Sequence, residues 1–357
     1  MSANIFNLPA VIRIAAAVMT ALALAFSPGS PDAEVRDTAA KVSSYPSDLT
    51  LLILTDVHYD PGKYQSGTGE RDILEPTMDA IRKIRERAGK KGIDAYWNLG
   101  DFINGHGTTK AEAIEQIRTV TAAQAGVSAD FHNIAGNHDS NIHAVWNNPP
   151  QPLSEVLTTE EVNGILENRT SSQTEHHNPA HPTDYYVDFE TVRAVCLSAE
   201  NTAFQQATAD WLQSTALDTD KEVLFLSHLP TRPEWGFWND VTGGEMIEAA
   251  VRAFLDRGGT VIAWIHGHDH GDMISAVTDE GGEVLWYEVC IGCARFQYPT
   301  SNGTQGMTFR PRNEKDATAL LFDVVSIDQT SGTVRFTRFG AGEDRAISYR
   351  RCKKTHY

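Results

Sequence analysis

The sequence predicts an α/β fold, in which strands and helices alternate along most of the chain and the C-terminal third adds further strands. Between residues 51 and 135, continuous apolar runs alternate with longer segments in which apolar residues recur at helical spacing. The short runs are typical of strands buried on both faces, and the longer segments of amphipathic helices. The alternation returns over residues 192–265, and residues 284–349 contain four more strand-like runs. Alternation favours a mainly parallel sheet, and the late strands favour a second sheet packed on the first.

The first half of the domain is expected to contain three strands and two helices. The strands are expected at residues 51–54, 95–99 and 131–135, which are continuous apolar runs. A helix is expected over residues 71–88, because its apolar side chains fall on one helical face. Thr109 and Glu112 have the spacing of a capping box, which predicts that a second helix begins there.

The second half begins with a long, polar and proline-rich segment at residues 147–184. We expect a loop there, with one helix after the capping pattern that starts at Thr158. Strands are then expected at residues 185–189, 192–197, 223–226 and 261–265. Capping patterns at Thr202 and Thr242 predict the helices between these strands. The last strands are expected at residues 284–291, 318–325, 333–338 and 345–349.

Residues 1–30 differ in composition from the rest of the chain and predict a secretory signal peptide. Arg13 precedes an apolar run at residues 14–26, and small residues, serine and proline follow it. The run is too short to cross a bilayer, which takes roughly 20 residues. We therefore expect a secreted, periplasmic or cell-surface protein without a transmembrane segment in its mature form. An uncleaved anchor or a disordered leader is the alternative. Residues 31–48 are expected to form a polar linker, and residues 49–350 a single domain.

The balance of charge argues against a nucleic-acid partner. The chain has 47 acidic and 30 basic side chains and a formal net charge of -17. A protein that binds a nucleic-acid backbone needs clustered Lys and Arg. A small anionic substrate is still compatible with this charge, because bound metal ions reverse the sign of the charge at their site.

The cysteines do not predict a fold based on disulfides. The chain contains Cys196, Cys290, Cys293 and Cys352, which are few for a chain of 357 residues. Those that lie in apolar runs are expected to be small core residues. The sequence leaves any pairing between them open.

Five short polar motifs follow the expected strands directly. They are Asp56-Val57-His58, Gly100-Asp101, Gly136-Asn137-His138-Asp139, Ser227-His228 and Gly267-His268-Asp269-His270. In α/β sheets, ligands bind at the carboxyl ends of the strands, where loops present side chains on a rigid base. We therefore expect motifs that are far apart in the sequence to converge in space.

The side chains of these motifs predict a two-metal hydrolase centre. The candidate ligands are Asp56, His58, Asp101, Asn137, His228, His268 and His270. Imidazole, carboxylate and amide ligands without a thiolate suit Mn, Fe, Zn or Co. Two such ions, held roughly 3.5–4 Å apart by a bridging carboxylate, generate hydroxide from bound water and stabilise the charge on a phosphoryl oxygen. His138 is then left for proton transfer.

This ordered set of motifs resembles the calcineurin-like metallophosphoesterase family over roughly residues 50–270. The resemblance implies a four-layer αββα sandwich with its site at the edge of the two central sheets. It implies that the first ion is bound by Asp56, His58 and His270, the second by Asn137, His228 and His268, and both by a bridging Asp101. It also implies that His138 acts as general acid or stabilises the transition state, and that Asp139 orients His138.

Differences from the motifs of two related groups of phosphatases narrow the subfamily that the chain resembles. Purple acid phosphatases carry Tyr three residues after the bridging Asp, where this chain has Asn104, and Gly where it has His58. A purple iron–tyrosinate site is therefore disfavoured. In the related protein phosphatases, Glu and Arg are found around the end of the third motif, where this chain has Asp139-Ser140. A protein phosphatase is therefore disfavoured. Residues 339–345 are similar to bacterial and phage-associated members of the family.

Four residues are candidates for substrate contact. Asn104 and His106 follow the bridging carboxylate among glycines that allow close backbone approach. Arg232 and Trp235 follow the fourth motif, where Arg232 can hold a phosphate and Trp235 can stack on a base or cover an apolar headgroup. Ordinary packing of an aromatic loop is the alternative. For His143 the sequence favours an ordinary loop residue.

The predicted function is an exported dinuclear-metal phosphoesterase that prefers a phosphodiester to a monoester. A small-molecule or lipid-headgroup substrate fits the acidic composition better than a polymeric nucleic acid. Two alternatives remain open. One is a non-catalytic cell-surface or phage-particle binding module on the same fold, and the other is a metal-dependent nuclease.

Overall fold

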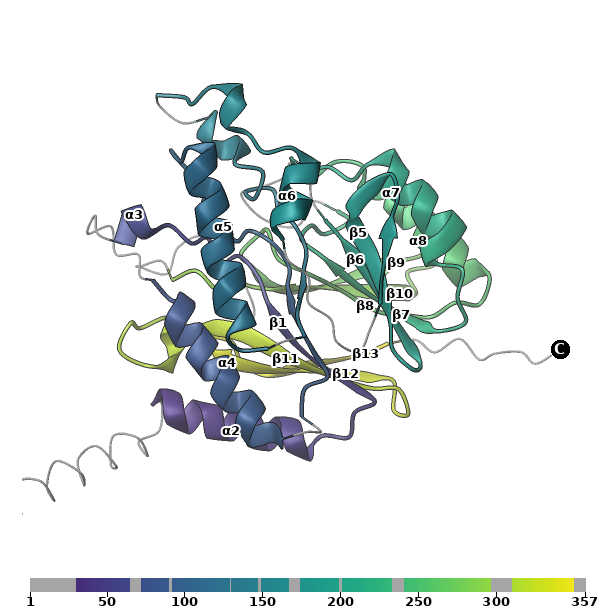
Figure 1. The fold of residues 1–357 in the computed structure, drawn as a ribbon. Coiled ribbons are helices and arrows are strands. Elements are labelled where there is room, and N and C mark those ends of the chain that lie inside the picture. The colour runs from purple at the N-terminus through teal and green to yellow at the C-terminus, as the bar shows by residue number, and fades with distance from the viewer. Residues whose placement is uncertain are drawn as a thin grey trace, which may run out of the picture.

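Two mixed β-sheets form the centre of the molecule, and helices cover their outer faces (Figure 1). The computed structural model describes residues 30–64, 72–89, 92–128, 130–146, 149–166, 174–198, 201–232, 241–296 and 310–349. Apolar residues of both sheets share one buried cluster, so the sheets pack face to face. The predicted four-layer αββα sandwich is confirmed.

The first sheet combines parallel strands from the start of the chain with antiparallel strands from its end. Its order is β13-β12-β11-β1-β2-β3. β1, β2 and β3 are parallel, and β11 lies antiparallel to β1. The bounds are Leu49–Leu54 for β1, Ala95–Asn98 for β2, His132–Asn133 for β3, Leu321–Asp328 for β11, Thr333–Gly340 for β12 and Arg345–Ser348 for β13.

The second sheet has a parallel centre and antiparallel edges. Its order is β4-β5-β6-β7-β8-β10-β9, and β6, β7, β8 and β10 are parallel. The bounds are Glu175–Asn178 for β4, His181–Asp188 for β5, Val192–Leu197 for β6, Glu222–Ser227 for β7, Val261–His266 for β8, Asp272–Thr278 for β9 and Val284–Ile291 for β10. The edge strands β4 and β9 were not predicted, because their residues are mostly exposed or half-buried and lack an apolar run.

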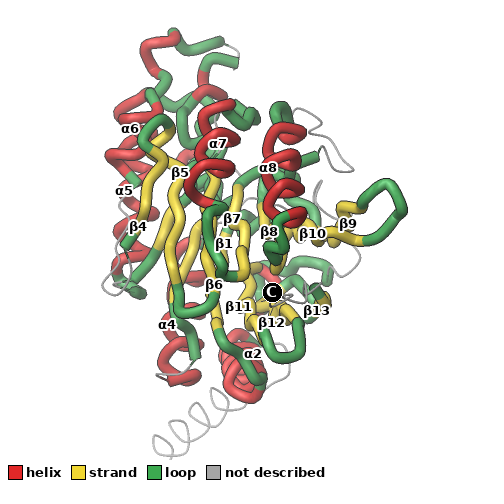
Figure 2. The backbone as a smooth tube through the Cα atoms, turned by 90° about the vertical axis from the view of Figure 1, so that its right-hand side faces the viewer, coloured by secondary structure: helices red, strands yellow, loops and turns green. Residues whose placement is uncertain are grey.

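Helices cover the two outer faces. Figure 2 shows α7 and α8 lying across the outer face of the second sheet. The helices are α2 (Pro31–Ser44), α3 (Pro61–Tyr64), α4 (Leu74–Ala88), α5 (Lys110–Ala125), α6 (Thr159–Ile165), α7 (Gln206–Trp211) and α8 (Gly244–Asp256). Short turns are the 3-10 helices η2 (Ile142–Ala144), η3 (Leu153–Glu155) and η5 (Ala317–Ala319), and the π-helical turn η4 (Leu212–Ala216) that continues α7.

β1 shows why its sequence is a continuous apolar run. Leu51 and Ile53 point into the layer between the two sheets, whereas Leu52 and Leu54 belong to the cluster under α2, α4 and α5. All four side chains are fully buried. Both faces of β1 are therefore core, as the run predicted.

The prediction of a polar linker at residues 31–48 was wrong. The segment forms α2, whose N-terminus is capped by the Ser30 hydroxyl, which accepts a hydrogen bond from the Ala33 amide at 3.2 Å. Its buried face includes Val35, Ala39 and Val42 and contributes to the core cluster that α4 shares. A capping Ser followed by Pro at the first helical position is the signal that identifies this helix.

Two of the four predicted capping patterns are confirmed. Thr109 and Thr158 form complete capping boxes at α5 and α6. Thr202 and Thr242 do not cap helices, because they are joined by a backbone hydrogen bond of 3.0 Å beside the bridge of Ala203. α7 and α8 begin four and two residues after these threonines.

Three of the cysteines lie in the described part of the chain. Cys196, Cys290 and Cys293 are buried, and none of the three is in a disulfide. Cys196 packs in the layer between the sheets. The expectation that they are small core residues is confirmed, and Cys352 lies outside the described residues.

A buried ionic cluster joins the two sheets. The guanidinium of Arg338 on β12 is fully buried and bonds Asp323 on β11 at 2.9 Å and also Asp272 on β9. Arg345 on β13 lies 2.7 Å from the same Asp272. A Cβ atom at Gly342 would lie 2.5 Å from Nε of Arg338, so the turn that follows β12 needs glycine there.

Replacing Arg338 with Met should therefore destabilise the protein strongly. The change leaves two buried carboxylates with one cation fewer, and removing one partner of a buried ion pair costs about 3–5 kcal/mol. Urea denaturation would measure the free energy of unfolding. Arg335→Met is the matched control on the same strand, because its ion pair with Asp328 has a long N–O distance of 4.0 Å, and such a pair near the surface contributes about 1 kcal/mol or less. Equal losses for the two variants would contradict this account of the cluster.

Candidate metal centre

The five motifs converge at the carboxyl ends of β1, β2, β3, β7 and β8, as predicted. Backbone hydrogen bonds tie the loops to one another. The Asp56 amide donates to the Gly100 carbonyl at 3.0 Å, and the His58 amide donates to the Asp101 carbonyl at 2.9 Å. The Gly267 amide donates to the His228 carbonyl at 3.2 Å.

Five of the seven predicted ligands have a left-handed backbone. Their φ values are 54° for Asp56, 46° for His58, 56° for Asp101, 67° for His268 and 53° for His270. A non-glycine residue in this region costs on the order of 1 kcal/mol or more, and such strain concentrates at functional sites. The strain therefore marks the same residues that the motifs mark.

The first group of candidate ligands consists of Asp56, His58, Asp101 and His270. Their ligand atoms all lie within 4.8 Å of one another. Nε2 of His58 is 2.9 Å from Nε2 of His270, which in turn is 3.2 Å from Oδ1 of Asp56. Two imidazoles and two carboxylates converge on one point, which is the arrangement that a divalent cation requires.

The second group consists of Asn137, His228 and His268. Oδ1 of Asn137 lies 3.0 Å from Nε2 of His228 and 2.9 Å from Nδ1 of His268. Oδ2 of Asp101 is 3.4 Å from Nε2 of His228 and also 3.4 Å from Nε2 of His58. The carboxylate of Asp101 therefore lies between the two groups, where a bridging ligand belongs.

The protonation states of these residues fit metal binding. Burial works against the charge on Asp56, but His270 and then His58 hold its pKa well below the usual range. Burial lowers the pKa of His58 to about 4, so its ring is neutral and has a lone pair for an ion. Burial also disfavours a charged His228, but Asp101 beside it raises the pKa of His228 to about 9. A cation that binds there takes the place of this proton.

Asp139 does not orient His138, which corrects the prediction. Its buried carboxylate accepts hydrogen bonds from the backbone amides of Gly136 at 2.7 Å, Asp101 at 3.0 Å and Phe102 at 2.8 Å. Asp139 thus fastens the second motif to the third. Burial, together with the neighbouring Asp101, raises the pKa of Asp139 to about 7.

The ring of His138 is oriented by a backbone carbonyl. Nδ1 of His138 lies 2.7 Å from the carbonyl oxygen of Asn104, so this nitrogen carries a proton and donates it. Nε2 faces the centre, 3.9 Å from Oδ2 of Asp101. Burial holds the pKa of His138 well below its usual range.

Asn104 was predicted to contact substrate, and the structure places it elsewhere. The residue is 1% exposed. Its side-chain amide donates to Asp60 at 2.9 Å and accepts from Arg295 at 2.8 Å. Both ends of the side-chain amide are engaged in hydrogen bonds. Asn104 is therefore held in place by its side chain, and its backbone carbonyl binds His138.

The other predicted substrate contacts have different outcomes. His106 is exposed, and its ring centroid lies 5.6 Å from that of His138, at the open side of the centre. Arg232 is not directed at the centre, because its guanidinium forms a two-point ion pair with Glu248 on α8. Trp235 lies outside the described residues.

Sequence reasoning missed the supporting residues Asp60, Arg295 and His143. Arg295 follows β10, which is parallel to β8 and therefore ends at the same edge of the sheet. The amide of Arg295 donates to the Asp56 carbonyl at 3.0 Å. The predicted strand at residues 284–291 was therefore a sixth strand end, and it could have indicated that Arg295 lies near the site.

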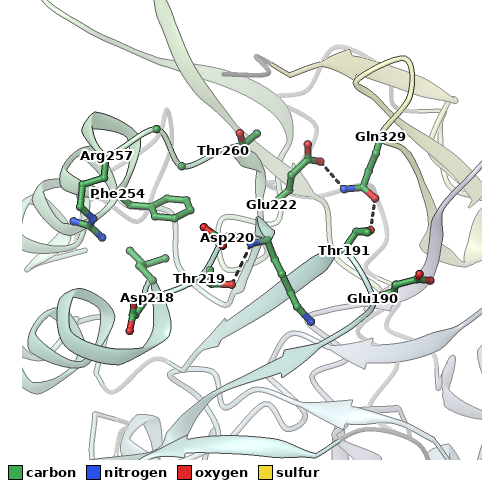
Figure 3. Close-up of a pocket in the computed structure, with 14 residues that line it drawn as sticks. Glu190, Thr191, Asp218, Thr219, Asp220, Glu222, Phe254, Arg257, Thr260 and Gln329 are labelled. Atoms are coloured by element: carbon green, nitrogen blue, oxygen red, sulfur yellow. Dashed lines mark hydrogen bonds between the residues drawn. The ribbon is translucent and has the colours of Figure 1, made fainter. Parts of the chain in front are cut away.

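A cavity of about 900 Å³ lies away from the centre (Figure 3). It is lined by residues 190–191, 218–222 and 257–260, which precede β6, β7 and β8. Gln329 donates to Glu222 across it at 2.8 Å. The metal-binding motifs follow these strands, so the cavity is at the opposite end of the sheet.

The fold and the converging carboxylates and imidazoles define a metal-dependent phosphoester hydrolase. The profile of the calcineurin-like phosphoesterases matches residues 49–272, more than half of the chain, and the chain belongs to this family. The resemblance inferred from the motifs is thereby confirmed. No curated protein matches the chain.

One solved structure supports the same fold. The chain is similar to a dimetal phosphatase from Danio rerio, with 17% identity and a TM-score of 0.53 over 85% of this chain and 100% of the other. It is also similar to the NAD nucleotidase of Haemophilus influenzae, with 11% identity and a TM-score of 0.40 over 84% of this chain and 49% of the other. At such identities the first likeness supports the fold alone, and the second supports no further argument. Among the described helices, none is both long and apolar enough to cross a membrane.

Changing Asp101 to Asn should weaken the binding of metal at both groups. The change removes the negative charge that the two groups share, so we expect at least the roughly 10- to 100-fold loss of affinity that follows changes in outer contacts of metal sites. Calorimetric titration of the metal-free protein with Mn²⁺ would measure both affinities. Asp256→Asn, at the exposed end of α8, is the control. Unchanged affinities in Asp101→Asn would refute the bridging position.

Proposed function

We propose that the protein is a dinuclear-metal hydrolase that prefers phosphodiesters to phosphomonoesters. The observation that carries the proposal is the position of Asp101, whose Oδ2 is equally far from His58 and His228. This is where a carboxylate must lie to serve two ions at once. The nitrogen and oxygen ligands favour Mn, Fe or Zn.

The residues divide the work of hydrolysis between them. Two bound ions would lower the pKa of a water molecule and stabilise negative charge on the phosphoryl oxygens. His138 presents Nε2 to the same space and transfers a proton to the departing oxygen. The negative charge of a bound phosphate raises the pKa of His138 towards the range in which it can act as an acid. The Asn104 carbonyl keeps the ring in the orientation that this step needs.

The charges around the centre support the preference for a diester. A monoester carries up to two negative charges on its phosphate and a diester one. The guanidinium of Arg295 is engaged by Asn104, and that of Arg232 by Glu248. The imidazoles of His106 and His143 lie beside His138, with centroid distances of 5.6 Å and 3.7 Å. A singly charged small-molecule or lipid-headgroup phosphodiester fits this surrounding best.

Hydrolysis of bis-p-nitrophenyl phosphate and p-nitrophenyl phosphate tests the proposal. With Mn²⁺ we expect kcat/KM to be higher for the diester, and a chelator to abolish turnover. His138→Ala should lose about 10²- to 10⁴-fold in kcat, the range that general acid catalysis supplies, with the smaller losses for good leaving groups.

This experiment, together with a measurement of DNA binding, separates the alternatives. Turnover of the monoester alone would make the protein a phosphatase. Two bound ions without turnover of either ester would favour the non-catalytic binding module. Binding to DNA that falls steeply with salt concentration would favour the nuclease.

We also propose that the protein is exported. The apolar run at residues 14–26, which is short and followed by small residues and proline, supports this. The full chain expressed in a bacterial host should appear outside the cytoplasm with a new N-terminus near residue 30. Recovery of the protein from the cytoplasm with residues 1–26 intact would contradict the proposal.

A further inference from the structure

His143 lies between two side chains of the centre. It is part of the turn η2, which follows the third motif. Its ring is parallel to that of His138, with the ring centroids 3.7 Å apart and 7° between the planes. Its Nε2 is 3.1 Å from Nδ2 of Asn137. One side chain therefore contacts both a metal ligand and the proton-transferring histidine.

The contact with Asn137 decides which end of its amide faces the metal. Oδ1 of Asn137 points at His228 and His268, and Nδ2 points at His143. Nδ2 is a donor, so Nε2 of His143 must accept with its lone pair. A turned-over amide would place an oxygen against this lone pair and direct its N–H groups at the ion. The acceptor on His143 thus selects the orientation that binds metal.

The contact with His138 restrains the plane of its ring. The hydrogen bond from Nδ1 of His138 to the Asn104 carbonyl restrains rotation of the ring within its own plane. The face of His143 limits tilting of the ring out of that plane. Trp146 packs edge-on against His143, with the centroids 4.7 Å apart. The two restraints together direct Nε2 of His138 at the centre.

The turn that carries His143 is itself rigidly held. Asn141 is fully buried and has a left-handed φ of 61°. Its side chain accepts from the Thr108 hydroxyl at 2.8 Å and donates to the carbonyls of Thr108 at 3.1 Å and Glu155 at 3.0 Å. The position of His143 is therefore determined by buried hydrogen bonds rather than by its own exposed edge.

A further metal site at this place is a weaker explanation. Ligand atoms of His106, His138 and His143 lie within 4.8 Å of one another. The lone pairs of an imidazole lie in its ring plane, however, and two stacked, nearly parallel rings cannot both direct a lone pair at one ion. Nδ1 of His138 and Nε2 of His143 are also engaged in hydrogen bonds.

We propose that His143 is a positioning residue with two separable tasks. Its Nε2 orients Asn137 towards the second ion, and its ring face holds His138 for proton transfer. The second task rests on the proposed function, whereas the first depends on metal binding alone.

Two substitutions separate the tasks. His143→Phe keeps a flat ring against His138 but has no acceptor for Asn137. His143→Gln places a side-chain oxygen near the position of Nε2 but has no ring. Calorimetric titration of the metal-free proteins with Mn²⁺ should show one of the two affinities falling roughly 10- to 100-fold in His143→Phe, because Asn137 belongs to only one group of ligands. The Mn²⁺ affinities of His143→Gln should remain within about threefold of those of the wild type, which is much less than the loss expected for His143→Phe.

The second task is tested by comparing the rates of hydrolysis of two esters that differ in their leaving group. The leaving group of methyl 4-nitrophenyl phosphate, 4-nitrophenolate, departs with little help from an acid. The phenolate of methyl phenyl phosphate needs more help. At saturating Mn²⁺, His143→Gln should lower the rate for the phenyl ester about tenfold more than for the nitrophenyl ester, a part of what general acid catalysis supplies. His143→Phe should leave the ratio of the two rates as in the wild type.

A matched control and a second variant keep the test decisive. His176→Phe makes the same change at an exposed histidine on the edge strand β4 and should alter neither readout. Should His143→Phe not fold by thermal melting, His143→Met replaces it as a variant without the ring nitrogen. Equal Mn²⁺ affinities in the wild type and His143→Phe or Met would overturn the first task. An unchanged rate ratio in His143→Gln would overturn the second.

The metal titration needs no turnover, so the two proposals can fail independently. If the wild type cleaves neither ester while His143→Phe still binds the second ion weakly, the proposed function fails and the role of His143 towards Asn137 stands. If both esters are cleaved and the affinities are equal, the function stands and this role fails.

Discussion

The centre depends on the way Asp101 is held. Its backbone amide donates to Asp139, its carbonyl accepts from the His58 amide, and Oδ1 accepts from the His138 amide at 2.9 Å. Only Oδ2 is left for the space between the two groups of ligands. A Cβ atom at Gly136 would lie 2.2 Å from Oδ1 of Asp101, which explains why the third motif begins with glycine. Every motif therefore contacts Asp101 or a residue that Asp101 fixes.

This arrangement stores backbone strain that the sheets must compensate. Five ligands have positive φ, at a cost of about 1–3 kcal/mol each. The strands that precede them are almost completely buried. Burial of apolar surface offsets the strain, because each fully buried large aliphatic side chain contributes roughly 1.5–3 kcal/mol.

The sequence predicted the parts of the site that follow from strand ends. Asp56 and His228 could be placed because each follows a continuous apolar run, and parallel strands bring their carboxyl ends together. The role of Asp139 could not be predicted, because its partners are backbone amides, which every residue has. The burial of Asn104 could not be predicted either, since it depends on Arg295, a contact between residues 191 positions apart. The same limit applies to the fold, where β4 escaped prediction because an edge strand needs no apolar run.

The C-terminal third supports the site although the family profile ends at residue 272. Three arginines from this part donate to carbonyls at the end of β10 and directly after it: Arg345 to Cys290 at 2.7 Å, Arg338 to Ile291 at 2.8 Å and Arg312 to Cys293 at 2.6 Å. This segment leads to Arg295, which holds Asn104, whose carbonyl in turn holds His138. Guanidinium groups suit this task because their several donors bind carbonyls and carboxylates at fixed angles. The buried cluster that joins the sheets is therefore linked, through Arg295 and Asn104, to the orientation of His138.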